Sequence, residues 1–184
     1  MRNEQITDYT SKQINMRTPI PLNERRTDYI YIAFFLVNLL FITYIVDLEQ
    51  LVIKDPANFK YPLWPLPFFV DMVHWWGNNF DPLQNARPMW WKATVWLDVL
   101  FFGPYYLAAA YAFINGKDWI RIPTFIIMSI LFTNVFIILS EEIWGPVNAT
   151  NLHLVILANA PWFLFPVFLV WKMWKKPYPF TREL

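Results

Sequence analysis

Four long apolar runs divide the chain and alternate with polar or mixed segments. They cover approximately residues 29–46, 93–114, 122–139 and 152–171. Each run has roughly 18–22 residues, and at 1.5 Å per residue this lets a helix cross a hydrocarbon core of about 30 Å. The pattern therefore predicts an all-α membrane protein, a bundle of four transmembrane helices.

The segments around these runs define the rest of the predicted organisation. Residues 1–26 read as a polar, exposed N-terminal tail, residues 27–176 as the membrane domain and residues 177–184 as a C-terminal tail. The longest connection, residues 48–91, contains six prolines and many aromatic residues. Tryptophan and tyrosine favour the membrane interface, so we expect this connection to lie there or over the bundle. Within it, residues 68–80 predict a short helix.

Glycine and proline predict where two of the spans are irregular. Gly103 and Pro104 stand inside the second run, where a kink is expected. Pro161 and Pro166 lie inside the fourth run and predict a bend. The stretch from Asn115 to Asp118 carries the signals of a helix end followed by a tight turn.

The distribution of basic residues predicts the orientation in the membrane. If there are four spans, 11 of the 15 lysines and arginines lie on the side that carries both termini. Basic residues are enriched in cytoplasmic segments. We therefore expect both termini to be cytoplasmic, or on the equivalent side of an internal membrane.

Composition excludes several classes of function. With 57% hydrophobic and 16% charged residues the chain is not intrinsically disordered, and a net charge of +1 gives no indication of nucleic acid. The absence of cysteine excludes disulfides, thiolate metal sites and cysteine nucleophiles. The two histidines, His74 and His153, are far apart and expected to serve packing, so no metal or cofactor is predicted.

Polar residues at or inside the runs are the candidates for a site. Asp47, Asp98, Glu141 and Asn159 all fall in the non-cytoplasmic half of the predicted bundle, with Asp98 and Asn159 about 9 Å deep. Ionisable groups at membrane depth are costly and face a bundle interior or a cavity. We expect these four side chains to converge in one aromatic-lined pocket.

Each candidate also has a simpler interpretation. Asp47 fits a helix cap or a solvated interfacial acid, and Asp98 fits a structural pair with Lys92 or a tyrosine hydroxyl. Glu142, beside Glu141, fits a solvated surface charge, and the amide of Asn159 fits a hydrogen bond between helices. The residues alone leave these interpretations open.

Several short stretches resemble the EXPERA family of four-helix membrane proteins, in its sigma-2 receptor-like and emopamil-binding-protein-like branches. The resemblance covers about residues 29–176, and the stretches that carry it are 46–50, 80–83, 96–99, 111–116, 119–123, 140–142 and 159–162. The resemblance implies that Asp47 and Asp81 are paired carboxylates of a ligand pocket. It also implies that Asp98 stands where relatives have Glu.

The pair of Asn159 and Trp162 resembles the pattern of the sterol-isomerase branch of the family. That branch has a histidine one turn before the acid of the first helix, where this chain has Thr43. Threonine is not a general acid at neutral pH, so the departure favours the receptor-like branch.

The resulting hypothesis is an integral membrane protein that binds a sterol-like or cationic amphipathic lipid ligand. Its ligand-binding residues are predicted to be Asp47, Asp81, Asp98, Glu141, Asn159 and Trp162. One alternative is a sterol or terpenoid double-bond isomerase, in which Asp98, Glu141 and Asn159 are the catalytic residues and supply part of the required acid, base and carbocation support.

A further alternative is an accessory subunit of a larger membrane complex. The expected partners are membrane lipids and a sterol-like small molecule, with a homodimer or a larger complex also open and nucleic acid not expected. The expected location is the endoplasmic reticulum or another internal membrane in a eukaryote, and the inner membrane in a bacterium.

Overall fold

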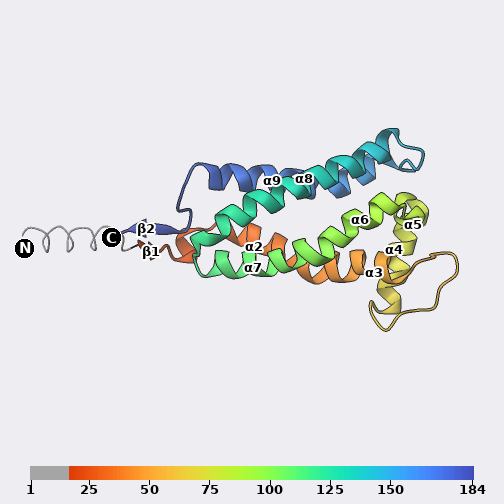
Figure 1. Cartoon of the computed structure of the whole chain (residues 1–184), viewed down its shortest axis with the longest axis horizontal. Coiled ribbons are helices and arrows are strands. Elements are labelled where there is room, and N and C mark those ends of the chain that lie inside the picture. Colours follow the sequence, from red (N-terminus) through yellow and green to blue (C-terminus); the bar gives the residue numbers. More distant parts are fainter. Residues whose placement is uncertain (1–16) are drawn as a thin grey trace, which may run out of the picture.

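The computed structural model describes residues 17–184, and these form four long helices that lie side by side (Figure 1). The four helices are Asp28–Val52, Met89–Ile114, Asp118–Trp144 and Leu152–Trp174. Each is long and apolar enough to cross a membrane, which confirms the predicted four-span helical class. Residues 1–16, most of the predicted polar tail, lie outside the described residues.

The first two spans each contain a π-helical segment between two α-helices. Their segments in chain order are α2 (Asp28–Val37), η2 (Asn38–Asp47) and α3 (Leu48–Val52), and then α6 (Met89–Leu97), η3 (Asp98–Phe102) and α7 (Gly103–Ile114). Hydrogen bonds in a π-helix join residues five apart, and such segments are frequent at functional sites. Next to Gly103 and Pro104, where a kink was expected, the second span changes from the π-helical segment η3 to α7.

The third and fourth spans form an antiparallel hairpin. The third comprises the 3₁₀ turn η4 (Asp118–Ile120) and α8 (Arg121–Trp144), and the fourth is α9 (Leu152–Trp174). Helices α8 and α9 pack along one another through their length (Figure 1). Helix α9 continues through both of its internal prolines.

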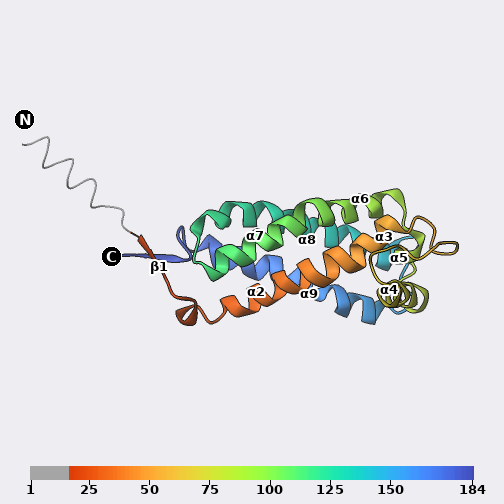
Figure 2. The same cartoon turned by 90° about the horizontal axis from the view of Figure 1, so that it is seen from below.

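The segments next to the membrane domain pair with each other. Strand β1 (Arg17–Pro19) runs antiparallel to β2 (Thr181–Glu183), at the end of the bundle from which both termini leave (Figure 2). The buried guanidinium of Arg25 donates to the carbonyls of Ile20 at 2.9 Å and Phe113 at 2.8 Å. Strand β1 and Arg25 thus anchor residues 17–26 to the protein, although half of these residues are exposed as their polarity suggests.

The long connection between the first two spans lies across the opposite end of the bundle (Figure 1). It contains α4 (Pro67–Asn79), which confirms the predicted short helix, and α5 (Leu83–Ala86). The indole N–H of Trp64 donates to the carbonyl of Tyr44 at 2.7 Å and attaches the connection to the first span.

Tight aromatic packing is concentrated in the half of the bundle near the termini. Phe35, Tyr106 and Phe113 are fully buried there, and the rings of Phe34 and Phe165 stack with centroids 4.1 Å apart. This half forms the main hydrophobic core, which holds the four helices together and leaves the opposite half less tightly filled.

Candidate functional site

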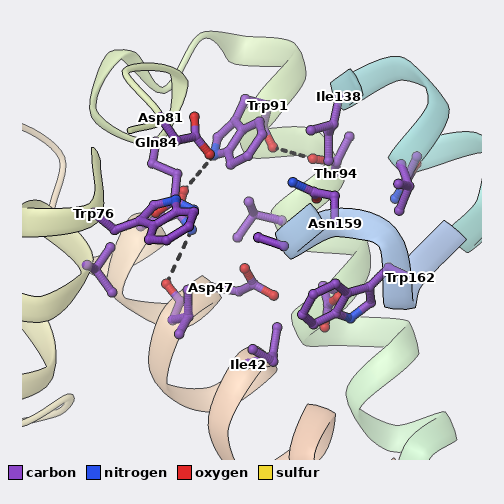
Figure 3. A pocket seen from close by; sticks show the side chains of 18 of the residues that line it. Ile42, Asp47, Trp76, Asp81, Gln84, Trp91, Thr94, Ile138, Asn159 and Trp162 are labelled. Carbon is purple, nitrogen blue, oxygen red and sulfur yellow. Dashed lines mark hydrogen bonds between the residues drawn. The ribbon is translucent and has the colours of Figure 1, made fainter. Parts of the chain in front are cut away.

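A cavity of about 480 Å³ lies in the half of the bundle opposite the termini. Its walls come from all four spans and from helix α4 and the short helix α5. Figure 3 shows labelled side chains from these elements turned toward a common space. The volume falls in the range of about 300–1,000 Å³ that is typical of small-molecule sites.

Three carboxylates line this cavity, and each comes from a different segment of the chain. Asp47 is the last residue of η2, Asp98 is the first residue of η3, and Asp81 lies in the turn between α4 and α5. Among the described residues that line the cavity there is no lysine, arginine or histidine. The cavity therefore gathers three acidic groups without a basic partner within its lining.

The π-helical segments bring the first and second spans together at Asp98. Asn38 and Thr43 are five residues apart in η2, the spacing of a π-helical hydrogen bond, and both are buried. The hydroxyl of Thr43 donates to Asp98 Oδ1. The partner of Asp98 is therefore Thr43, and the suggested pairing with Lys92 or a tyrosine is not found among the described residues.

Gly103 makes this close approach of the two spans possible. A Cβ atom on Gly103 would lie 2.8 Å from Tyr44 Oη and 3.0 Å from Thr43 Cγ2. Both distances are shorter than normal contacts, so a larger residue would push η2 away from the second span. The glycine thereby helps to set the separation at which Thr43 reaches Asp98.

Asp81 has the smallest exposed surface of the three acids, 2%. Burial raises the pKa of Asp81, while contacts with Glu142, the backbone N–H groups of Gln84 and Leu83 and the indole of Trp76 act in the opposite direction. Burial is the larger effect. The folded protein therefore favours the protonated form of this carboxyl.

Helix α9 supplies the opposite wall with Asn159 and Trp162, as Figure 3 shows. The Asn159 amide donates to the carbonyl of Val155 in its own helix at 2.9 Å. The bond between helices that was suggested for Asn159 is instead made by Asn38, whose Oδ1 accepts from the indole of Trp162 at 2.5 Å.

The neighbouring acids at the end of α8 have different environments. Glu141 does not line the cavity: its carboxylate accepts from the backbone N–H of Val147 at 3.2 Å and borders a shallower hollow. Glu142 is 1% exposed, so its interpretation as a solvated charge is wrong. Adjacent residues of a helix point about 100° apart, and the sequence does not say which of the two turns inward.

Sequence reasoning missed a buried ionic cluster of Glu49, His74 and Arg87, which joins α3, α4 and the segment before α6. Arg87 Nη2 lies 2.7 and 3.1 Å from the two oxygens of Glu49, and His74 Nε2 lies 2.9 Å from Glu49 Oε1. Arg87 also donates to the carbonyl of Ile53 at 2.6 Å. These residues are far apart in the sequence and form no motif, so no local signal could have identified the cluster.

Polar side chains next to the acids were also missed. Gln50 Oε1 accepts from the indole of Trp91 at 2.6 Å, and both residues line the cavity. Gln50 follows Asp47 by three residues, about one helical turn, and this spacing is the one sequence signal that could have placed it in the site.

Four membrane-spanning helices around an acidic, aromatic-lined cavity define an integral membrane protein with an intramembrane pocket. The sequence profile of EXPERA (EXPanded EBP superfamily) matches residues 68–173, more than half of the chain, and the chain belongs to this family. The resemblance seen in the short motifs is thereby confirmed.

The chain is also similar to proteins named sigma intracellular receptor 2. It is 27% identical to that of Macaca fascicularis over 173 residues and 26% identical to that of Homo sapiens over 172 residues. Each match covers 86% of this chain and 93% of the relative. The protein of Xenopus tropicalis is 28% identical over 147 residues, which cover 74% of this chain and 81% of the relative.

Proposed function

We propose that this protein binds a cationic amphipathic or sterol-like lipid ligand in the cavity between its spans. The observation that carries the proposal is the presence of Asp47, Asp81 and Asp98 in a cavity whose described lining has no basic residue. The names of the relatives, which are intracellular receptors, are consistent with ligand binding.

Electrostatics supports a cationic ligand. A carboxylate at membrane depth is destabilising unless it is paired or hydrated. The ammonium of an amphiphile supplies the missing positive charge, and the attraction is stronger in a cavity of low dielectric than in water. Trp76, Trp91 and Trp162 line the same cavity and offer aromatic faces for a cation.

The three acids are assigned different roles. Asp47 accepts no hydrogen bond from another side chain in the described part of the protein, and we assign it as the counterion of the ligand. Asp98 is oriented by Thr43 and adds charge beside Asp47. Asp81 places a third acidic group at the outer end, while Asn159 and Trp162 border the body of the ligand from α9.

The experiment is equilibrium binding of a labelled cationic amphiphile to the purified protein in detergent or nanodiscs. We expect Asp47→Asn and Asp81→Asn to abolish binding while the helical circular dichroism stays unchanged. Asp71→Asn is the matched control, because Asp71 is exposed on α4 and bonds to the hydroxyl of Tyr61. Wild-type affinity in both cavity variants would reject the proposal.

A second candidate, sterol or terpenoid isomerisation, is favoured by the presence of Asp98, Asn159 and Trp162 in one cavity. Shifting a ring double bond requires one group to protonate a carbon and another to deprotonate a neighbour. Thr43, at the position of the isomerase histidine, is engaged in orienting Asp98. Incubating the protein with sterols that carry a migratable ring double bond, and finding no shifted product, would remove this candidate.

The proposed orientation keeps both termini on the cytoplasmic side, so the cavity lies toward the opposite leaflet. The basis is the excess of lysine and arginine on the terminal side. In a eukaryote, the proposed location is the endoplasmic reticulum or another internal membrane.

A further inference from the structure

We propose that Glu142 shares a single proton with Asp81, and that Glu142 is a positioning residue which sets the charge of the cavity at its outer end. The shared proton is a property of the empty protein, whereas its effect on a ligand rests on the proposed binding of a cation.

The two carboxyl groups meet between elements distant in sequence. Glu142 belongs to the last turn of α8, and Asp81 lies in the turn between α4 and α5. Glu142 is 1% exposed and Asp81 is 2% exposed, and their side chains are within hydrogen-bonding contact. The backbone joins the same segments, because Thr150 N–H donates to the carbonyl of Phe80 at 3.0 Å.

Carboxyl oxygens of Asp81 and Glu142 lack a hydrogen-bond donor unless one of the two groups is protonated. In the described part of the chain, no N–H or hydroxyl donor reaches either oxygen of Glu142, or Oδ1 of Asp81. Two ionised carboxylates are acceptors only, so a bond between them requires one to be protonated. A single shared proton supplies that donor and removes the repulsion between two buried negative charges.

The nearby basic groups do not neutralise the pair, because they are engaged elsewhere. On α4, His74 contacts Glu49, and Arg87, which precedes α6, binds the same Glu49. On α8, the neighbouring charge is Glu141, which adds repulsion. Helix α4 and the turn into α5 face Asp81 with neutral donors, the indole of Trp76 and backbone N–H groups.

The arrangement also explains how Glu142 acts on the cavity without lining it. Asp81 borders the cavity, whereas the Glu142 oxygens are covered behind it. A ligand cation therefore approaches Asp81, and Glu142 decides whether Asp81 carries full charge. Loss of the shared proton makes the outer end more negative and strengthens attraction for a cation.

The first test needs no ligand. Infrared spectra of the purified protein report the carbonyl band of a protonated carboxylic acid as the pH is varied. We expect one such band in the difference spectrum between wild type and Glu142→Gln. The difference spectrum between wild type and Asp81→Asn should contain the same band. Glu141→Gln is the matched control and keeps the band. Absence of the band from both differences would overturn the shared proton.

The second test measures the affinity of a quaternary ammonium amphiphile, whose charge does not change with pH. In wild type, we expect affinity to rise with pH across an ionisation, by up to about tenfold per pH unit for one linked proton. Glu142→Gln keeps a donor to Asp81 and should lose this step, while Glu141→Gln should retain it.

The two experiments distinguish failure of the proposed ligand binding from failure of the proposed role of Glu142. A band without any binding by wild type would reject the proposed function and leave the proton pair standing. Binding with an unchanged pH profile in Glu142→Gln would overturn the positioning role.

Discussion

The hydroxyl of Thr43 donates a hydrogen bond to Asp98 Oδ1 and joins the π-helical segments of the first two spans. Asp98 is the first residue of η3, and Thr43 lies four residues before Asp47 in η2. One interhelical bond thus orients an acid of the cavity and fixes the segment that carries another. The π-helical segments and the two acids that they carry, Asp47 and Asp98, therefore form one local structure.

Replacing Thr43 with valine should weaken binding of a cationic amphiphile by about threefold to tenfold, because Asp98 loses its donor while the volume stays similar. Thr43→Ser retains the hydroxyl and should bind nearly as well as wild type. Equilibrium binding to both purified variants checks the prediction. Equal affinity of the valine and serine variants would show that the bond does not support the site.

Gly103→Ala should lower the free energy of unfolding by about 1–3 kcal/mol, the usual cost of overpacking. Its Cβ would press on Tyr44 and Thr43. Denaturant unfolding in detergent measures the change, with Leu107→Ala on the exposed side of α7 as the control. A stability equal to wild type would mean that the two spans separate without cost.

Glu49→Gln should destabilise the fold by about 3–5 kcal/mol, because it leaves the buried guanidinium of Arg87 without its counterion. Glu24→Gln breaks the exposed pair with Arg182 and should cost less than about 1 kcal/mol. Thermal unfolding of the two variants compares them directly. Similar small effects would indicate that water reaches the Glu49–Arg87 pair.

Asp81→Asn should change how stability depends on pH. Burial raises the pKa of Asp81, so the wild-type fold is favoured at low pH and loses that contribution as pH rises through this pKa. The asparagine variant does not ionise, and its melting temperature relative to wild type should increase over the same range. Asp71→Asn, on the exposed side of α4, should show no such trend, and a flat difference for Asp81→Asn would contradict the prediction.

The absence of cysteine allows a direct test of orientation. Lys117 lies between the second and third spans, and Asn58 lies in the long connection. Both positions are exposed, and each is replaced by cysteine in a separate variant. In intact cells or organelles, a membrane-impermeant maleimide should label the two variants from opposite sides of the membrane. The cysteine of Lys117→Cys should react from the cytoplasm. Labelling of Asn58→Cys from the cytoplasm instead would reverse the proposed orientation.

Part of the site was predictable because depth in a membrane follows from position in a span. Asp47 and Asp98 were both expected in the non-cytoplasmic half of the bundle, and both line the cavity. Glu141 was expected beside them and lies outside, while its neighbour Glu142 is buried. Depth along a helix is a matter of counting residues, whereas the direction of a side chain around the helix depends on packing.

The sequence by itself determined the four spans, the short helix α4 and the family, because apolar length and local motifs are properties of contiguous residues. Tertiary structure alone decided the cluster of Glu49, Arg87 and His74, the pairing of β1 with β2, and the contact of Asp81 with Glu142. These contacts join residues from 25 to 166 positions apart along the chain. Their formation depends on how helices pack around one another, and no local pattern of residues encodes that packing.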